Sequence, residues 1–280
     1  MARTDARSIY DSSDDTTKAK LAELSGKLIE GIFATAISSG IKNVEYSGDP
    51  TTGSVEVNRF KNAVSKDYGA ARTAGKGELL RNTGKVTVNI NQRKEIVEEV
   101  NGTDLALFGI AGLAEKRANN HLKQMVAVLD RAFFAEAEAK ATNVVLTGIT
   151  AVEEVAEKMI QTIISVKNDW VDGVEKDDVV MTLNPKTYGK LRTYFDKVTV
   201  PTVNSGTREI NMFHGVETIE NLRQTVDVLI QVKGAVALPV LVKQYDAEKI
   251  PLSNDYALEL FYDYGIAVLA KDLIFKGTLA

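Results

Sequence analysis

Apolar side chains recur at helical spacing over the longest uninterrupted stretch of the chain, from about Asp104 to Lys140. After Gly112, neither glycine nor proline interrupts the pattern before Gly148. At 1.5 Å per residue the predicted helix is about 55 Å long, and globular helices average only about a dozen residues. The middle of its apolar stripe carries the small residues Ala114 and Ala118. We therefore expect another element to approach this helix closely there.

The same spacing, together with capping residues, predicts three shorter helices. They are expected at Asp14–Ser38, from Thr150 to about Asn168, and from Asn184 to about Phe195. The second opens with a capping box formed by Thr150 and Glu153. The third is capped by Asn184 and has Pro185 in its first turn.

Alternating apolar residues predict two strands, one through Val55 and Val57 and one through Val86, Val88 and Ile90. The stretch between them is punctuated by glycine and has few large apolar residues, so it buries little area by itself. We interpret it as a long hairpin-like loop, and a loop of this length is typically functional. We expect it to dock on another subunit. Asn91–Val100, which follows, is predicted to be a polar connector or a short helix.

The last third of the chain is rich in strands. Val179–Leu183 is rich in β-branched residues and is predicted to be a strand. At the other end of the chain, residues 1–13 are polar and are predicted to form an extended arm. Further strands are predicted at Asn43–Tyr46, Thr218–Ile219, Val226–Val232, Val236–Lys243, Ala257–Tyr264 and Ile266–Phe275. Helices early and strands late indicate an α+β fold.

Charge is distributed unevenly along the chain, whose net value is −4. The segment Arg59–Lys94 has nine basic residues but only Asp67 and Glu78 as acidic ones, which gives +7 and leaves −11 for the remainder. The basic residues are Arg59, Lys61, Lys66, Arg72, Lys76, Arg81, Lys85, Arg93 and Lys94. Such a segment suggests contact with something acidic, either nucleic acid or an identical neighbour.

Docking between subunits is the interpretation that we favour, ahead of a solvated loop and of nucleic-acid binding. Only Phe60 and Tyr68 are interleaved aromatics, no nucleic-acid motif is present, and the whole chain is acidic. Two sets of acidic residues are candidates for the receiving surface. They are Glu95, Glu98, Glu99 and Asp104, or Glu115, Asp130, Glu136 and Glu138 on the long helix.

Catalytic, metal-binding and cofactor-binding residues are not predicted, and we expect the chain not to be an enzyme. Cysteine is absent, and the two histidines, His121 and His214, lack metal-ligand spacing. His121 falls on the apolar stripe and is expected to be a core or interface histidine. The glycines around Lys76 and before Lys85 do not fit a phosphate-binding loop. The most apolar stretch, Ala235–Val242, is too short for a bilayer, so no membrane partner is expected.

The order of these elements resembles that of the major capsid proteins of tailed bacteriophages, whose fold encapsulins share. The most specific part runs from Phe60-Lys61 and Asp67-Tyr68-Gly69 through Glu95-Ile-Val-Glu98-Glu99 to Arg117-Ala-Asn119-Asn120-His121. It is similar to the loop and spine-helix region of these proteins. Tyr264-Gly265-Ile266-Ala267-Val268 resembles their closing strands.

The resemblance implies a division into four regions. These are an N-terminal arm (1–45), an extended loop (46–94, with its tip at about 54–90), a peripheral domain with the spine helix 104–140 (95–150 and 245–280), and an axial domain (151–244). Only a few dozen residues precede the loop, so we expect no long N-terminal scaffolding segment. A scaffolding protein, where one is used, is then a separate chain.

The function implied is that of a virion shell, assembled in the bacterial cytoplasm from hexamers and pentamers of identical subunits around double-stranded DNA that is not read by sequence. A portal is a further implied partner. Two alternatives stay open at this point. One is an encapsulin-type nanocompartment shell, and the other is a soluble oligomeric enzyme.

Overall fold

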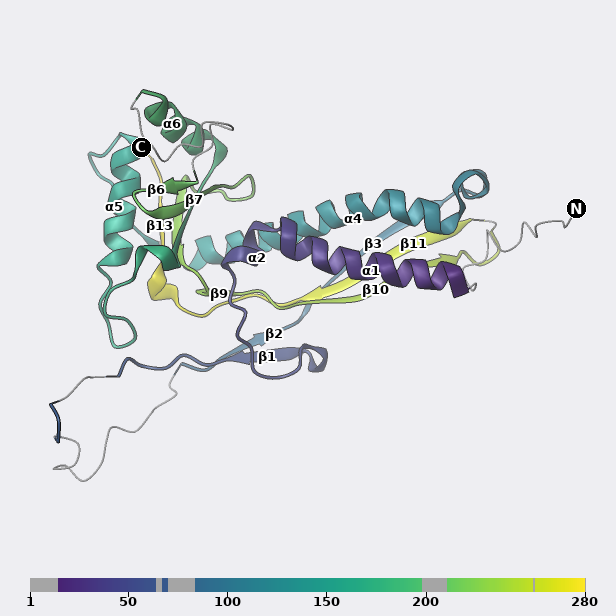
Figure 1. The fold of residues 1–280 in the computed structure, drawn as a ribbon, viewed down its shortest axis with the longest axis horizontal. Helices are drawn as coiled ribbons and strands as arrows, with labels where there is room; N and C mark the ends of the chain where they lie inside the picture. Colours follow the sequence, from purple (N-terminus) through teal and green to yellow (C-terminus); the bar gives the residue numbers. More distant parts are fainter. Residues whose placement is uncertain (1–14, 64–66, 70–83, 198–210, 254, 280) are drawn as a thin grey trace, which may run out of the picture.

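The structure is a computed structural model that describes residues 15–63, 67–69, 84–197, 211–253 and 255–279. Within these ranges the chain forms an elongated body with a compact lobe at one end, and a two-stranded ribbon projects beneath the body (Figure 1). The mixture of helices and strands confirms the predicted α+β class.

The predicted long helix is present as α4 (Gly102–Lys140), and we call it the spine helix. Its 39 residues correspond to about 58 Å. Helix α1 (Asp15–Thr35) lies along it (Figure 1). The two helices approach closely, because a β-carbon at Gly31 would lie 2.5 Å from Cδ2 of Leu122. The main hydrophobic core forms between them and the adjacent sheet.

The predicted first helix is interrupted at Ala36, which has extended backbone angles. Helix α1 ends at Thr35, and a short helix, α2 (Ile37–Ile41), follows. The break has a physical cause in the buried carboxylate of Asp130 on the spine helix. Its Oδ1 accepts hydrogen bonds from the backbone N (3.0 Å) and the hydroxyl (2.7 Å) of Ser38. This contact turns the start of α2 toward the spine.

A three-stranded antiparallel sheet covers one side of the spine helix, in the order β10 (Val240–Lys249), β11 (Tyr256–Tyr264), β3 (Gln92–Val100). Strand β3 corrects the prediction of a connector or short helix at Asn91–Val100. It pairs along its whole length with β11, from Gln92 opposite Tyr264 to Val100 opposite Tyr256. One face of this edge strand is exposed to solvent, so β3 has few of the alternating apolar residues by which a strand is recognised in a sequence.

The compact lobe is built on a six-stranded mixed sheet with its own hydrophobic core. Helices α5 (Val152–Ile164) and α6 (Pro185–Lys197) pack on it. The strand order is β4 (Thr142–Asn143), β13 (Ile274–Gly277), β8 (Val228–Val232), β5 (Val179–Leu183), β7 (Val216–Glu220), β6 (Met212–Phe213). Strand β13 thus places the end of the chain in this sheet, whereas the predicted division puts 245–280 with the spine helix.

Of the two helix caps predicted for this lobe, one is present and the other is not. Asn184 caps α6, with its Oδ1 accepting from the backbone N of Thr187 at 2.8 Å. The predicted cap at Thr150 is wrong, because α5 begins one residue later than a Thr150 cap requires. Its N-cap is Ala151, which makes no side-chain capping bond.

Two of the predicted C-terminal strands are each divided. Val236–Lys243 is split into β9 (Val236–Ala237) and the start of β10, with the buried Pro239 between them. Proline lacks the backbone N–H that a continuous strand needs. Ile266–Phe275 is split into β12 (Ala267–Val268), a 3₁₀ turn (Lys271–Leu273) and β13. Residues Asn43–Tyr46 supply an isolated bridge from Asn43 to Ala237 instead of a strand.

The ribbon consists of β1 (Ser54–Val57) and β2 (Val86–Asn89), which pair antiparallel as the alternation predicted. A 3₁₀ turn, Pro50–Thr52, precedes it. Val55 and Val88 are fully buried and pack with Ala237 in a third, small core. The ribbon is therefore anchored to the body at this end, and residues 58–63 and 84–85, the base of the basic loop, continue from its other end (Figure 1).

Candidate subunit-contact surfaces

The basic residues at the base of the loop form ion pairs within their own chain. The guanidinium of Arg59 donates two hydrogen bonds to the carboxylate of Asp272, with Nη1–Oδ1 at 2.7 Å and Nη2–Oδ2 at 2.8 Å. These hydrogen bonds hold the pKa of Asp272 below its ordinary value, against the opposing effect of burial. Two-point pairs of this kind are among the strongest hydrogen bonds in proteins.

Lys61 and Lys85 follow the same pattern with more exposed partners. Nζ of Lys61 lies 2.6 Å from Oδ2 of Asp169, and Nζ of Lys85 lies 2.7 Å from Oε1 of Glu56. The predicted contact residues Lys66, Arg72, Lys76 and Arg81 lie outside the described residues. The charge of the loop base is thus balanced locally.

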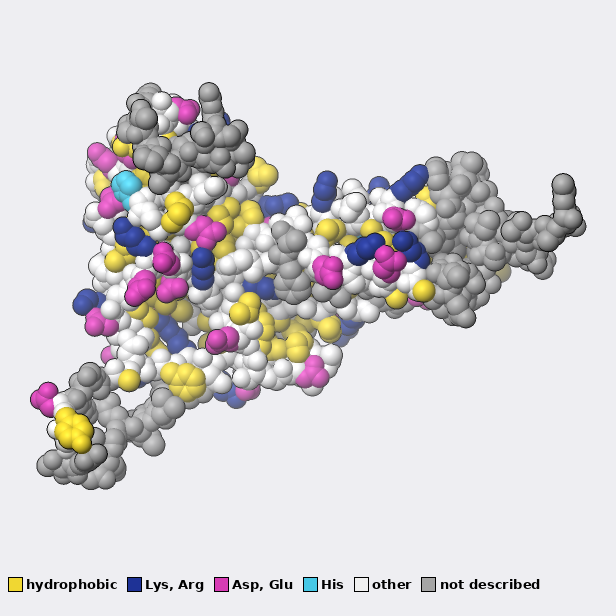
Figure 2. All heavy atoms as spheres, in the orientation of Figure 1, with side chains coloured by type: hydrophobic (Ala, Val, Ile, Leu, Met, Phe, Trp, Pro, Cys, Tyr) yellow, Lys and Arg dark blue, Asp and Glu magenta, His cyan; other side chains and the backbone are white. Residues whose placement is uncertain are grey.

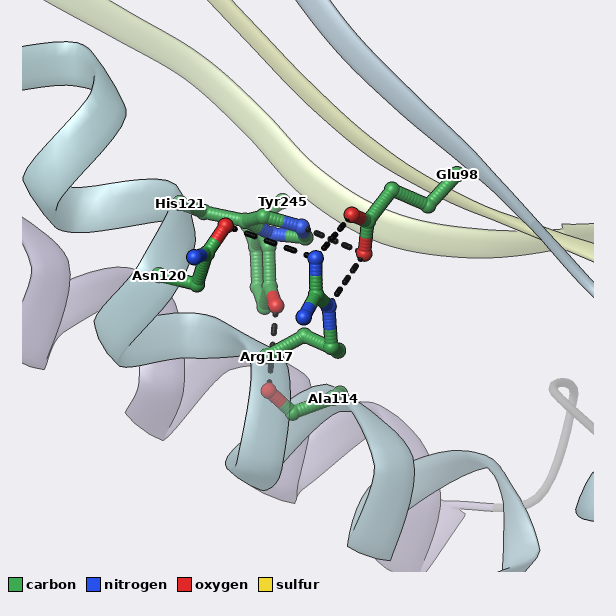
Figure 3. A network of polar contacts seen from close by, with 6 residues as sticks. All are labelled: Glu98, Ala114, Arg117, Asn120, His121 and Tyr245. Carbon is green, nitrogen blue, oxygen red and sulfur yellow. Dashed lines mark hydrogen bonds and ion pairs between the residues drawn. The ribbon is translucent and has the colours of Figure 1, made fainter.

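Glu98, a predicted receiving residue, faces the spine helix from β3 (Figure 3). Arg117 approaches its carboxylate with two guanidinium nitrogens, and Nε–Oε2 measures 2.6 Å. Nε2 of His121 lies 2.9 Å from the same Oε2. The pKa of Glu98 falls to about 2, first because of the hydrogen bond from Arg117 and despite desolvation by burial. Glu98 therefore joins two elements of one subunit.

His121 is fully buried, so of the two predicted roles, core or interface histidine, it has the core role. Its ring meets the ring of Tyr245 edge to face at 5.7 Å. The hydroxyl of Tyr245 donates to the backbone oxygen of Ala114 at 3.1 Å, so the tyrosine side chain of β10 reaches the spine helix at this small residue (Figure 3). Desolvation raises the pKa of Tyr245 to about 12.

Glu95 and Glu99 lie on the opposite face of β3 from Glu98, since side chains alternate along a strand. Residues paired across neighbouring strands point to the same face of the sheet. One row across β3, β11 and β10 therefore contains Val97, Glu259 and Asp246, and the next contains Glu99 and Glu248. We call this the acidic sheet face, defined by Glu95, Glu99, Asp246, Glu248 and Glu259. Sequence reasoning missed its last three members because they come from strands about 150 residues away.

Like charges repel one another within the acidic sheet face. The pKa of Glu259 is raised above its ordinary value, first by desolvation and then by the charges of Glu248, Asp246 and Glu95. Such a surface favours a positively charged partner.

The acidic residues on the spine helix differ in their burial and in their partners. Asp130 is fully buried, which corrects its selection as a contact candidate. Its carboxylate faces α2 instead of a neighbour. Glu138 is also buried and accepts a hydrogen bond from the backbone N of Thr225 at 2.7 Å. Glu115 is exposed, 4.0 Å from Lys20 of α1. The side chain of Asp104 lies outside the described residues.

In the described part of the chain, no group of three or more acidic or histidine side chains is arranged to hold a metal ion. His214 is exposed in the turn between β6 and β7, where its Nδ1 lies 2.5 Å from Oε2 of Glu157. None of the helices in the described ranges is long and apolar enough to cross a membrane. On the face drawn in Figure 2, basic and acidic side chains are interspersed.

Solved structures share this architecture at low sequence identity. A chain of Mycobacterium phage Che8 has a TM-score of 0.58 and 16% identity, covering 80% of this chain and 84% of that one. The mature capsid of bacteriophage PhiM1 has a TM-score of 0.60 and 13% identity, covering 88% and 87%. This chain has the tailed-phage major capsid fold.

The capsid fold confirms the fold predicted from the order of elements. It is also shared by a virus-like particle from Pyrococcus furiosus, with a TM-score of 0.55 and 16% identity over 91% of this chain and 98% of that one. No protein-family model and no curated protein matches the sequence. At such low identity the likeness concerns the arrangement of the backbone.

Proposed function

We propose that this chain is a major capsid protein that assembles with identical copies into an icosahedral shell around the double-stranded DNA of a tailed bacteriophage. The observation that carries the proposal is the capsid fold, which extends over 80 to 91% of the chain in the comparisons above. A structural role, and not catalysis, is the role that these neighbours support.

The mechanism is geometric. The body is elongated, and a two-stranded ribbon projects beneath it, anchored by Val55 and Val88 in a small core (Figure 1). Each subunit makes contacts through different surfaces of identical copies, and such heterologous contacts close into rings and shells. The compact lobe gathers around the axes of hexamers and pentamers, and the loop reaches over the next subunit.

Charge complementarity supports one particular contact, between the basic loop of one subunit and the acidic sheet face of the next. Between the two ribbon strands the loop carries seven basic residues against Asp67 and Glu78, a net charge of +5 on an otherwise acidic chain. Arg59, Lys61 and Lys85 pair within the subunit, which leaves Lys66, Arg72, Lys76 and Arg81 for the proposed contact. Glu95 and Glu99, two of the predicted receiving residues, belong to the acidic sheet face. Each exposed pair contributes only about 0–1 kcal/mol, but repetition over many subunits sets the docking orientation.

The proposed shell confines DNA by its wall and does not read sequence. The net charge of −4 argues against tight binding of phosphates by the chain as a whole. A portal and, where used, a separate scaffolding protein complete the assembly, which takes place in the bacterial cytoplasm and ends in the virion.

Electron microscopy of the purified chain tests the proposal. We expect large uniform closed particles. Small discrete oligomers with no larger species would overturn it.

The loop contact is tested by replacing Arg72, Lys76 and Arg81 together with glutamine. We expect particle yield to fall several-fold, because the loop loses three of its seven basic residues. A matched control replaces the exposed Lys123, Lys158 and Lys190, which lie on helices, with glutamine. Equal yields from the two triple variants would contradict the contact.

An encapsulin-type compartment is the second candidate, favoured by the likeness to the Pyrococcus furiosus virus-like particle, of which 98% is covered. The contents of purified particles distinguish the two candidates. Nuclease-protected DNA in particles from phage-producing cells supports the capsid, whereas a co-purifying protein enclosed in the particles supports the compartment.

A further inference from the structure

The loop leaves the body at a point where three segments that are distant in the sequence converge. Its two strands are still joined there, because the backbone N of Arg59 donates to the oxygen of Gly84 at 3.2 Å. The other two segments are the turn Asn168–Val171 after α5 and the 3₁₀ turn that contains Asp272. We call the contact between them the loop latch, defined by Arg59, Lys61, Gly84, Asn168, Asp169, Trp170 and Asp272.

Arg59 is held in the latch from two directions. Its guanidinium pairs with Asp272 through two hydrogen bonds and also lies over the ring of Trp170, 5.0 Å from the ring centre. The planar guanidinium suits both contacts, which a lysine ammonium does not reproduce. Asp272 is held in turn, because Nδ2 of Asn168 donates to its Oδ2 at 2.7 Å. Position and direction of the Arg59 side chain are both fixed.

Trp170, the only tryptophan of the chain, contacts both strands of the loop base. Besides Arg59, it lies against Gly84 on the returning strand, where a β-carbon would be 3.2 Å from its Cη2 and 2.8 Å from Cβ of Arg59. A residue with a side chain at position 84 would push these groups apart. The indole ring therefore contacts both strands of the loop base.

The turn that presents Trp170 is itself well ordered by hydrogen bonds. Oδ1 of Asn168 accepts from the backbone N atoms of Trp170 (2.8 Å) and Val171 (3.0 Å). The turn also grips the outgoing strand, since the backbone N of Asn62 donates to the oxygen of Asp169 at 3.1 Å and Lys61 pairs with the Asp169 carboxylate. The latch thus combines polar contacts with the packing of the indole ring.

Ordinary core packing does not hold the loop base at this point. Arg59, Trp170 and Asp272 lie outside the three hydrophobic cores. A hollow of about 980 Å³ opens beside them, and its far wall includes Glu136 and Lys140 near the end of the spine helix. Apolar side chains of Ile266, Val268 and Leu269 also line this hollow. Within the described residues, however, the hydrogen bonds and ion pairs of the latch join the loop base to the turns of the body, so we expect its direction to depend on the latch.

We infer that the loop latch sets the angle at which the loop projects from the body, and so positions the loop for docking on the neighbouring subunit. This inference rests on the proposed shell function. Arg59, Trp170 and Asp272 act here as positioning residues within one subunit. Their loss is expected to widen the range of loop directions and to leave the cores intact.

Distance measurements on unassembled protein test the first half of the inference. The chain has no cysteine, so a pair of spin labels can be placed at Ala63→Cys beside the latch and Lys158→Cys on α5, both exposed. We expect Trp170→Ala and Asp272→Asn each to broaden the distance distribution at least twofold. Asp172→Asn is the matched control, because it breaks an exposed pair with Lys167 next to the same turn. Equal widths in all variants would overturn the latch.

Assembly of the same variants tests the second half. We expect Trp170→Ala and Asp272→Asn to unfold within about 2 °C of the wild type, because they leave the cores unchanged, but to give several-fold fewer closed particles and a wider spread of particle sizes. Arg59→Lys should fall between them and the control. Broadened distances with particles of normal yield and size would refute the positioning role. A wild type without particles would refute the shell function, while the spin-label distances would still judge the latch.

Discussion

Arg117 of the spine helix and Glu98 of β3 form a two-point ion pair that fastens the edge strand of the three-stranded sheet to the helix. The buried His121 contacts the same carboxylate, four residues further along the helix. Strand β3 connects the loop ribbon to the spine helix in sequence, so this contact fixes the two relative to each other. A residue selected as a contact for a neighbour thus serves the rigidity of its own subunit.

Glu98 is expected to make the free energy of unfolding depend on pH. Its pKa in the folded chain is about 2, below the ordinary 4.5. A depressed carboxyl pKa contributes stability that is complete above about pH 4.5 and is lost as the pH falls toward 2. Glu98→Gln should therefore cost about 2 kcal/mol at pH 7, after allowance for solvent screening, and almost nothing near pH 2. Urea unfolding at both pH values measures this.

The control for this experiment is Glu99→Gln, because Glu99 is the exposed neighbour on the other face of β3. We expect it to change the free energy of unfolding by less than about 0.5 kcal/mol. The same loss in Glu98→Gln at pH 7 and pH 2 would show that the charge of Glu98 does not contribute.

Asp130→Ala is expected to destabilise the chain by about 3 kcal/mol, because it leaves the amide and hydroxyl of Ser38 without their acceptor in the interior. Asp130→Asn keeps one carbonyl oxygen and should cost less. The exposed Glu115, on the same helix, provides the control variant Glu115→Ala. Denaturant unfolding gives the three free energies, and a loss in Asp130→Ala no larger than in the control would exclude the role proposed for this buried carboxylate.

Periodicity along the chain was sufficient for the elements whose signal is local. The spine helix, the ribbon and the α6 cap follow from spacing and from capping residues a few positions apart. Strand β3 could not be recognised in this way, because its partner β11 begins more than 150 residues later and its charged residues conceal the alternation. The break at Ala36 has the same origin, since Asp130, which causes it, lies 92 residues from Ser38.

The sequence was sufficient to predict the charge of the candidate contact surfaces but not which residues form ion pairs. The excess of basic residues in the loop is visible in the sequence. Their partners at the loop base are not, because Asp169 and Asp272 come from turns that only the fold brings to Lys61 and Arg59. Likewise Glu95 and Glu99 were selected, but Asp246, Glu248 and Glu259 join them only through strand pairing.

Glu259→Gln is expected to stabilise the folded subunit slightly at neutral pH. The pKa of Glu259 is raised, so its ionised form opposes folding, and this cost grows as the pH rises through the folded pKa. Neutralisation should raise the free energy of unfolding by roughly 0.5 kcal/mol at pH 7, since the site is partly solvated, and the gain should vanish well below pH 4. Thermal unfolding at the two pH values measures the change. A loss of stability at pH 7 would contradict repulsion within the acidic sheet face.

Gly265 is expected to tolerate no side chain. It follows β11, and its backbone N donates to the oxygen of Pro239 at 3.0 Å. A β-carbon there would lie 2.4 Å from the oxygen of Asn89 and 2.9 Å from its carbonyl carbon. Both belong to backbone at the end of β2 and cannot rotate away, so Gly265→Ala should cost about 3 kcal/mol.

Gly26 supplies the contrasting substitution, because it lies within α1 and nothing is within 4 Å of a β-carbon built on it. Gly26→Ala should stabilise the chain by about 0.5–1 kcal/mol through helix propensity alone. Chemical denaturation of the two variants therefore gives opposite signs. If Gly265→Ala were as stable as the wild type, the backbone of β2 would not pass as close to the end of β11 as described.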